Sequence, residues 1–133
     1  MKHVWMVLVL ATTLAGCAVG IQPDGSSPSV SYTVPRDYQT VYLRAQNQAS
    51  ECLRGQSSFE VRSEVDPVAQ TGRVSVVDPL TDIEVARTSV KAQDARNTQV
   101  EQVVWGRGSW DLNALHAMRE SIILDDSVCF AYK

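Results

Sequence analysis

The spacing of apolar residues changes twice along this chain, and this change constrains its fold more than any other feature. Between residues 37 and 53, apolar side chains recur every three or four positions, which is typical of one face of a helix. From residue 58 to 106 they alternate with polar side chains, as in strands, and beyond residue 109 the helical spacing returns. The sequence therefore predicts a helix, several strands and a second helix, in that order.

The first helix is expected over residues 37–53. Asp37 is a suitable N-cap, and Gly55 is a suitable stop just after the last turn. The apolar face consists of Tyr38, Val41, Tyr42, Ala45, Ala49, Cys52 and Leu53. The alanines in this stripe favour close packing of the helix against a sheet.

Four strands are expected between the two helices. They cover residues 59–65, 73–77, 83–92 and 98–106. Short turn-forming stretches that begin at Asp66, Asp78 and Gln93 separate them, so neighbouring strands should form an antiparallel meander. In the third strand the alternation slips near Ala86, which a β-bulge would explain.

The second helix is expected to follow Ser109 as its N-cap and to end at Asp125. Its apolar stripe contains Leu112, Leu115, Met118 and Ile122. Because a meander with one apolar face needs cover, both helices should pack on that face. We therefore expect a two-layer α+β domain over residues 36–133, with the element order α-β-β-β-β-α and a four-stranded sheet.

Charged residues of both signs occupy the other face of the expected sheet. They are Glu60, Arg62, Glu64, Arg73, Glu84 and Arg87. This pattern is most simply interpreted as a solvated face with cross-strand ion pairs, each worth about 0.2 to 1 kcal/mol. The alternative is a binding surface.

The beginning of the chain differs in composition from the rest. After Lys2 and His3, residues 4–15 are uncharged and largely apolar. This run is too short for a membrane-spanning helix, which needs about 20 residues. A short basic start, an apolar run and then small residues are typical of a secretory signal peptide.

The signal-like segment ends in Leu14-Ala15-Gly16-Cys17. This stretch resembles the lipobox of bacterial lipoproteins. The resemblance implies that Cys17 receives a thioether-linked diacylglycerol, that cleavage before it removes residues 1–16, and that the new N-terminus is acylated. In the enterobacterial sorting rule, Asp in place of Ala18 signals inner-membrane retention, so Ala18 favours the outer membrane. The alternative is an ordinary signal peptide with an incidental cysteine.

Residues 17–35 are expected to form the lipidated N-terminus and a flexible tether. Gly, Pro and Ser are frequent from residue 18 onward and follow no period. Fully extended, this segment reaches about 60 Å, which would let the domain stand away from the membrane. Tyr32 and Val34 are the first residues expected to pack on the domain.

The chain has three cysteines. If Cys17 carries lipid, as the resemblance implies, Cys52 and Cys129 remain as an even pair in an oxidising compartment. We predict a disulfide between them, and the long loop that it closes would contribute about 4.5 kcal/mol on the chain-entropy model. The alternatives are two reduced thiols or a metal pair, although neither cysteine lies in a CxxC motif or beside a histidine.

The sequence contains no recognisable catalytic, cofactor or metal-binding motif. His116 would be the only histidine of the processed chain, and it could serve a hydrolase only if the fold brought a nucleophile such as Ser109 close to it. Arg107, Gly108 and Ser109 could bind an anion, because they precede a predicted helix N-terminus. The simpler interpretation of residues 105–111 is a strand-to-helix turn.

The charge of the chain restricts its partners. The formal net charge of −3 becomes about −4 without Lys2, and such a chain lacks the basic patch that nucleic acid requires.

The element order over residues 36–130 is similar to that of small Gram-negative outer-membrane lipoproteins. We therefore expect a non-enzymatic domain without a cofactor. It should be anchored to the outer membrane, with the domain facing the periplasm or, as the alternative, the cell surface. Its expected role is structural or in binding an envelope protein, as an accessory to an envelope assembly. The alternatives are a periplasmic module that binds a small or lipidic ligand, and a hydrolase.

Overall fold

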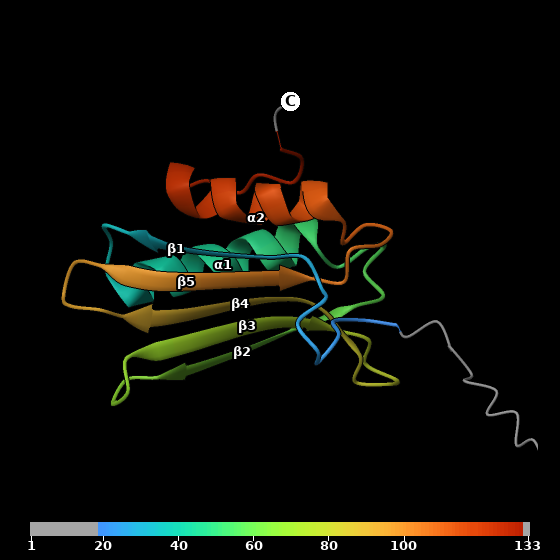
Figure 1. The fold of residues 1–133 in the computed structure, drawn as a ribbon, viewed down its shortest axis with the longest axis horizontal. Helices are drawn as coiled ribbons and strands as arrows, with labels where there is room; N and C mark the ends of the chain where they lie inside the picture. Colours follow the sequence, from blue (N-terminus) through green and yellow to red (C-terminus); the bar gives the residue numbers. More distant parts are fainter. Residues whose placement is uncertain (1–18, 132–133) are drawn as a thin grey trace, which may run out of the picture.

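Five antiparallel strands and two helices make up the part of the chain that the computed structural model describes, residues 19–131 (Figure 1). In chain order they are β1 (Ser29–Val34), α1 (Tyr38–Cys52), β2 (Glu60–Asp66), β3 (Thr71–Val77), β4 (Glu84–Ala92), β5 (Thr98–Val104) and α2 (Leu112–Leu124). The strands form one sheet in the order β1-β5-β4-β3-β2, and both helices pack on one of its faces. The α+β architecture is thus confirmed, whereas the predicted count of four strands is wrong. The expected signal peptide, residues 1–16, and Cys17 lie outside the described residues.

The additional strand, β1, comes from the segment that composition assigned to a flexible tether. It pairs antiparallel with β5 along its whole length, and Tyr32 lies opposite Val100. Val30, Tyr32 and Val34 alternate with serine and threonine, and all three belong to or pack against the core. The tether prediction is therefore wrong for β1, because its alternating apolar residues complete the edge of the sheet.

The residues just before β1 also contact the sheet, and we call residues 19–28 the N-terminal arm. The backbone N–H of Ile21 donates a hydrogen bond to the carbonyl of Glu84 (2.8 Å). At the other end of the arm, the carbonyl of Pro28 accepts from the N–H of Val104 (3.0 Å). The chain therefore joins the domain ahead of β1, because the arm is hydrogen-bonded to the start of β4 and to the end of β5.

Gly20 is expected to be essential for docking of the arm. A Cβ atom at this position would lie 2.5 Å from Cγ2 of Ile83 and 2.7 Å from the carbonyl oxygen of Glu84, and its φ is +89°. The Gly20→Ala substitution should therefore lower the free energy of unfolding by about 1 to 3 kcal/mol and expose the arm to protease. Gly25→Ala is the matched control, since Gly25 also has a positive φ (+80°) but open space around it. Equal effects of the two substitutions would contradict the role of Gly20.

The predicted N-cap is correct for α1 and wrong for α2. Asp37 is the N-cap of α1 as predicted, and its carboxylate accepts from the N–H of Thr40 (3.0 Å). Hydrogen bonds from the Thr40 side chain and backbone lower the pKa of Asp37. The predicted N-cap of the second helix, Ser109, is wrong. Asp111 caps α2 instead, accepting from the N–H of Ala114 (3.0 Å).

The core lies between the helices and one face of the sheet. Val74 and Val76 of β3 face the helices and are 3% and 1% exposed. Val85 and Ala86 are both buried, because the pairing of β3 with β4 shifts register between Val76 and Val77. The irregularity predicted near Ala86 is therefore confirmed.

The other face of the sheet carries the expected ion pairs, and we call it the open face. Arg62 contacts Asp82 (2.7 Å) and Glu60 (3.4 Å). Glu84 contacts both Arg73 (3.1 Å) and Arg87 (2.6 Å). Because these side chains bridge three neighbouring strands and the β3–β4 turn, they help to fix the register of an otherwise solvated face.

Candidate functional site

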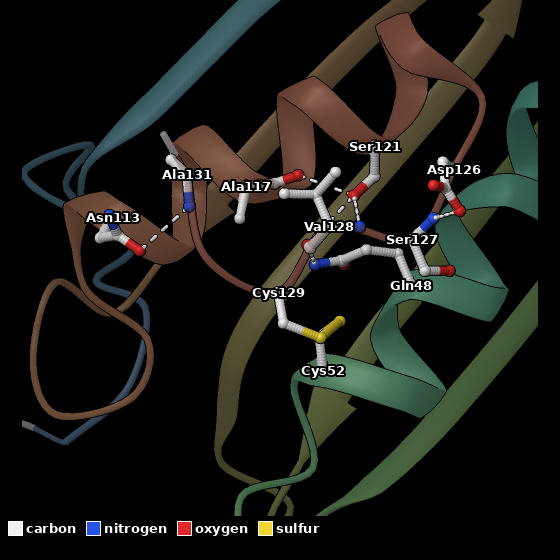
Figure 2. Close-up of a disulfide and its surroundings, with 10 residues drawn as sticks. All are labelled: Gln48, Cys52, Asn113, Ala117, Ser121, Asp126, Ser127, Val128, Cys129 and Ala131. Atoms are coloured by element: carbon white, nitrogen blue, oxygen red, sulfur yellow. Dashed lines mark hydrogen bonds between the residues drawn. A yellow bond between two sulfur atoms is a disulfide. The ribbon is translucent and has the colours of Figure 1, made fainter. Parts of the chain in front are cut away.

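A disulfide ties the end of α1 to the C-terminal segment. Cys52, the last residue of α1, is bonded to Cys129, and their Cα atoms are 5.0 Å apart (Figure 2). The pairing predicted from the cysteine count is confirmed. Because the two residues are 77 positions apart, the bond joins chain segments that would otherwise depend on non-covalent contacts alone.

Buried polar side chains hold the C-terminal segment beside this disulfide. The amide of Gln48, on α1, donates to the carbonyl of Val128 (3.2 Å), and the Ser121 hydroxyl accepts from the N–H of Val128 (2.9 Å). Ser121 in turn donates to the carbonyl of Ala117 (2.8 Å), as Figure 2 shows. Gln48 and Ser121 are 2% and 0% exposed. The position of Cys129 is therefore set by both helices and not by the disulfide alone.

An aromatic cluster lies next to the disulfide. Trp110 packs edge-on against Phe59, with ring centroids 4.3 Å apart, and lies 6.4 Å from the ring of Trp105. Its indole N–H donates to the carbonyl of Leu53 at 2.8 Å, just beyond the end of α1. Trp110 is therefore both a core residue and the link between the turn before α2 and the end of α1.

An open groove of about 890 Å³ runs between the disulfide and these aromatic residues, and we call it the disulfide groove. Its lining includes Cys52, Phe59, Trp110, Asn113, Cys129 and Phe130. Phe130 is 81% exposed, which is unusual for a residue of this size next to an apolar wall. Aromatic side chains form part of its walls, and polar side chains lie among them, from Gln56, Ser58, Ser109, Asp111 and Asn113. It was not foreseen, because it depends on where the last residues of the chain come to lie.

The three residues proposed to bind an anion lie together in one exposed turn. The N–H of Gly106 donates to the carbonyl of Trp110 (2.7 Å), and this contact closes the turn around Arg107, Gly108 and Ser109. The N-terminus of α2 is capped by the Asp111 carboxylate, which places a negative charge where an anion would bind. An anion site here remains a hypothesis that the cap disfavours.

The pair considered for hydrolysis is not assembled. His116 is exposed on α2, Ser109 is exposed in the turn before it, and no hydrogen bond joins them among the described residues. Within residues 19–131, no three His, Cys, Asp or Glu side chains form a group that could hold a metal ion.

A buried polar chain that the sequence did not reveal crosses the sheet under α2. The Tyr32 hydroxyl donates to Oε1 of Gln102 (2.7 Å), and the Gln102 amide donates to the Thr88 hydroxyl (3.3 Å). The guanidinium of Arg119 lies 5.5 Å from the centre of the Tyr32 ring. Gln102 is 1% exposed, so this network satisfies polar groups in the core and specifies how β1, β5 and β4 align.

Alkaline pH is expected to destabilise the domain through Tyr32. Burial raises the pKa of its phenol above the usual value near 10, with the Arg119 charge acting in the opposite direction. The folded state therefore binds this proton more tightly than the unfolded state, so the contribution is complete below about pH 10 and is lost at higher pH. Between about pH 9 and 12, the free energy of unfolding should fall more steeply for the wild type than for Tyr32→Phe. Parallel pH profiles would contradict this.

Within residues 19–131, no helix is both long enough and apolar enough to cross a membrane. The function of the chain has to be inferred from its own residues and contacts. No protein-family model matches this chain, and no curated protein matches it at a significant level.

Proposed function

We propose that this protein is a bacterial lipoprotein held in the outer membrane by lipid on Cys17. The observation that carries the proposal is the pairing of Cys52 with Cys129, which leaves Cys17 as the single cysteine outside the disulfide. That cysteine ends the Leu14-Ala15-Gly16-Cys17 stretch that resembles a lipobox. Lipid transfer uses a thiol as the nucleophile, and two or more acyl chains anchor a protein stably where one does not.

The Cys17→Ser variant tests the anchor in cells. We expect the wild-type protein in the membrane fraction, released by detergent and not by high salt, because acyl chains are held by burial in the bilayer. Cys17→Ser should leave that fraction. The Cys52→Ala/Cys129→Ala double variant keeps Cys17 and should stay membrane-bound. Wild-type protein in the soluble fraction, or Cys17→Ser retained like the wild type, would contradict the proposal.

The domain itself is proposed to act by binding an envelope protein. The open face supports this role, because neither helix covers it and because it contains an open depression of about 580 Å³. The hollow is lined by charged residues of both signs, among them Glu64, Arg73, Lys91 and Glu101. A surface of this kind suits a polar protein partner whose charges complement it.

Charge reversal on the open face tests this role. The membrane-bound protein should co-purify with a stoichiometric partner after cross-linking, and the Arg73→Glu/Lys91→Glu variant should lose it. Arg107→Glu is the control, since Arg107 is exposed in the turn before α2. A partner retained equally by both variants, or the lack of any partner for the wild type, would contradict binding through this face.

The disulfide groove favours a second candidate function, the binding of an apolar ligand. Phe130 stands exposed at its edge, and Trp110 in its wall would report binding through its fluorescence. A fluorescent fatty-acid probe should bind the wild-type protein and bind Phe130→Ala more weakly, whereas Val68→Ala at the opposite end should bind normally. Equal binding by all three would rule out this function.

A further inference from the structure

The N-terminal arm limits how far the domain can stand from a lipid on Cys17. Gly20 packs against Ile83 and Glu84, and the next residue is hydrogen-bonded to Glu84. Three residue steps separate Cys17 from Gly20, and three steps of extended chain reach about 11 Å. The docked arm therefore keeps the domain close to the lipid on Cys17, whereas a free tether of residues 17–35 would let the domain move about 60 Å away from it.

The β3–β4 turn, residues 78–83, lies at the same end of the sheet as the arm. The N–H of Asp78 donates to the carbonyl of Ile83 (2.9 Å), so the turn is closed directly beside Gly20. In Figure 1 the turn and the start of the arm leave the sheet at the same end. We call this end, formed by Val19, Gly20 and residues 78–83, the anchor end.

Apolar side chains point into solvent at the anchor end. Leu80, at the tip of the turn, is 93% exposed, and Val19 is 52% exposed. Two of the nearby carboxylates are paired, Asp82 with Arg62 and Glu84 with Arg73 and Arg87. The third, Asp78, accepts from the N–H of Leu80 (2.9 Å) and makes no ion pair among the described residues. Pairing lowers the cost of bringing Asp82 and Glu84 near a lipid surface, because each has an opposite charge within contact distance.

The opposite end of the sheet provides an internal comparison. Val68 lies in the β2–β3 turn and is 95% exposed, so it is as accessible as Leu80. The seven residues of β3 separate the two turns, a distance of about 20 Å along the strand. The short link from Cys17 therefore keeps the β3–β4 end within about 11 Å of the lipid and sets no such limit on the β2–β3 end.

We propose that the anchor end rests on the membrane, with the side chains of Leu80 and Val19 in the lipid interface and the β2–β3 turn directed away from it. This inference rests on the proposed lipidation of Cys17. It adds an orientation, because the domain is fixed upright on its anchor and presents its open face sideways to neighbouring envelope proteins.

Depth-dependent quenching tests this orientation. The full-length lipidated protein, carrying Leu80→Cys or Val68→Cys labelled with an environment-sensitive fluorophore, is reconstituted in vesicles of phosphatidylethanolamine and phosphatidylglycerol. Nitroxide groups on the lipids should quench the label at residue 80 several-fold more than the label at residue 68. A Gly-Ser insertion of about 20 residues after Ala18, with a reach of about 70 Å, should remove this difference without releasing the protein.

The outcomes separate the orientation from the anchor. Protein that floats with the vesicles but shows equal quenching at residues 80 and 68 would overturn the orientation and leave the anchor intact. A difference that survives the Gly-Ser insertion would overturn the role of the short link. Protein that carries no lipid and does not float with the vesicles would overturn the proposed function and the orientation together.

Discussion

Removing the disulfide between Cys52 and Cys129 is expected to lower the free energy of unfolding by about 2 to 5 kcal/mol. The bond closes a loop with a sequence separation of 77, so the unfolded chain regains considerable freedom when it is absent. The Cys52→Ala/Cys129→Ala double variant, followed by urea denaturation, measures this loss. The folded domain should persist at low urea, because Gln48 and Ser121 still bind the C-terminal segment.

Reductant provides the control for the disulfide prediction. It should destabilise the wild-type protein by a similar amount and leave the double variant unchanged. A wild-type protein that denatures at the same urea concentration with and without reductant would contradict a stabilising bond.

Truncation of Trp110 is expected to be as severe, at about 3 to 5 kcal/mol for Trp110→Ala. The ring is 8% exposed, packs against Phe59 and Trp105, and donates its N–H to Leu53, so the substitution removes packing and leaves a buried carbonyl without its donor. Urea denaturation measures the loss.

Two further substitutions show which part of Trp110 matters. Trp110→Phe keeps an aromatic ring and loses the donor, so it should cost clearly less than Trp110→Ala. Leu112 was expected in the packed stripe of the second helix, but it is the first residue of α2 and is 56% exposed. Leu112→Ala should therefore change the free energy of unfolding by less than about 0.5 kcal/mol. If Trp110→Ala were no more harmful than Leu112→Ala, Trp110 would not link α1 to the turn before α2.

Most of the fold follows from local spacing. Both helices, the four strands β2 to β5 and the irregularity near Ala86 agree with apolar periodicity, because each of these segments is long enough to show its period. Val65 departs from this. Alternation along β2 places it on the same face as Val61, which packs against the core, yet it is 45% exposed, because β2 is the edge strand and the helices do not fully cover it.

The missed strand β1 shows where composition misleads. Val30, Tyr32 and Val34 alternate as strand residues should, but a stretch rich in Gly, Pro and Ser precedes them, and Pro35 follows. The alternation typical of a strand was therefore present, but nothing nearby in the sequence indicated a partner strand. That partner, β5, lies about 70 residues later in the chain, as the side-chain hydrogen bond from Tyr32 to Gln102 illustrates.

The start of α2 shows a choice that local sequence leaves open. Ser109 and Asp111 are both good N-caps, and only the closed turn from Gly106 to Trp110 selects the second. The disulfide could be predicted by counting cysteines, whereas the disulfide groove could not. Its walls come from three segments that meet only in the folded chain.

The intact mass of the protein extracted from envelopes shows whether Cys17 carries lipid. We expect a chain that begins at Cys17 and carries the added mass of a diacylglyceryl group and a further acyl chain, with Cys52 and Cys129 resistant to alkylation until reductant is added. A chain that begins at any other residue and carries no lipid would contradict the anchor on Cys17.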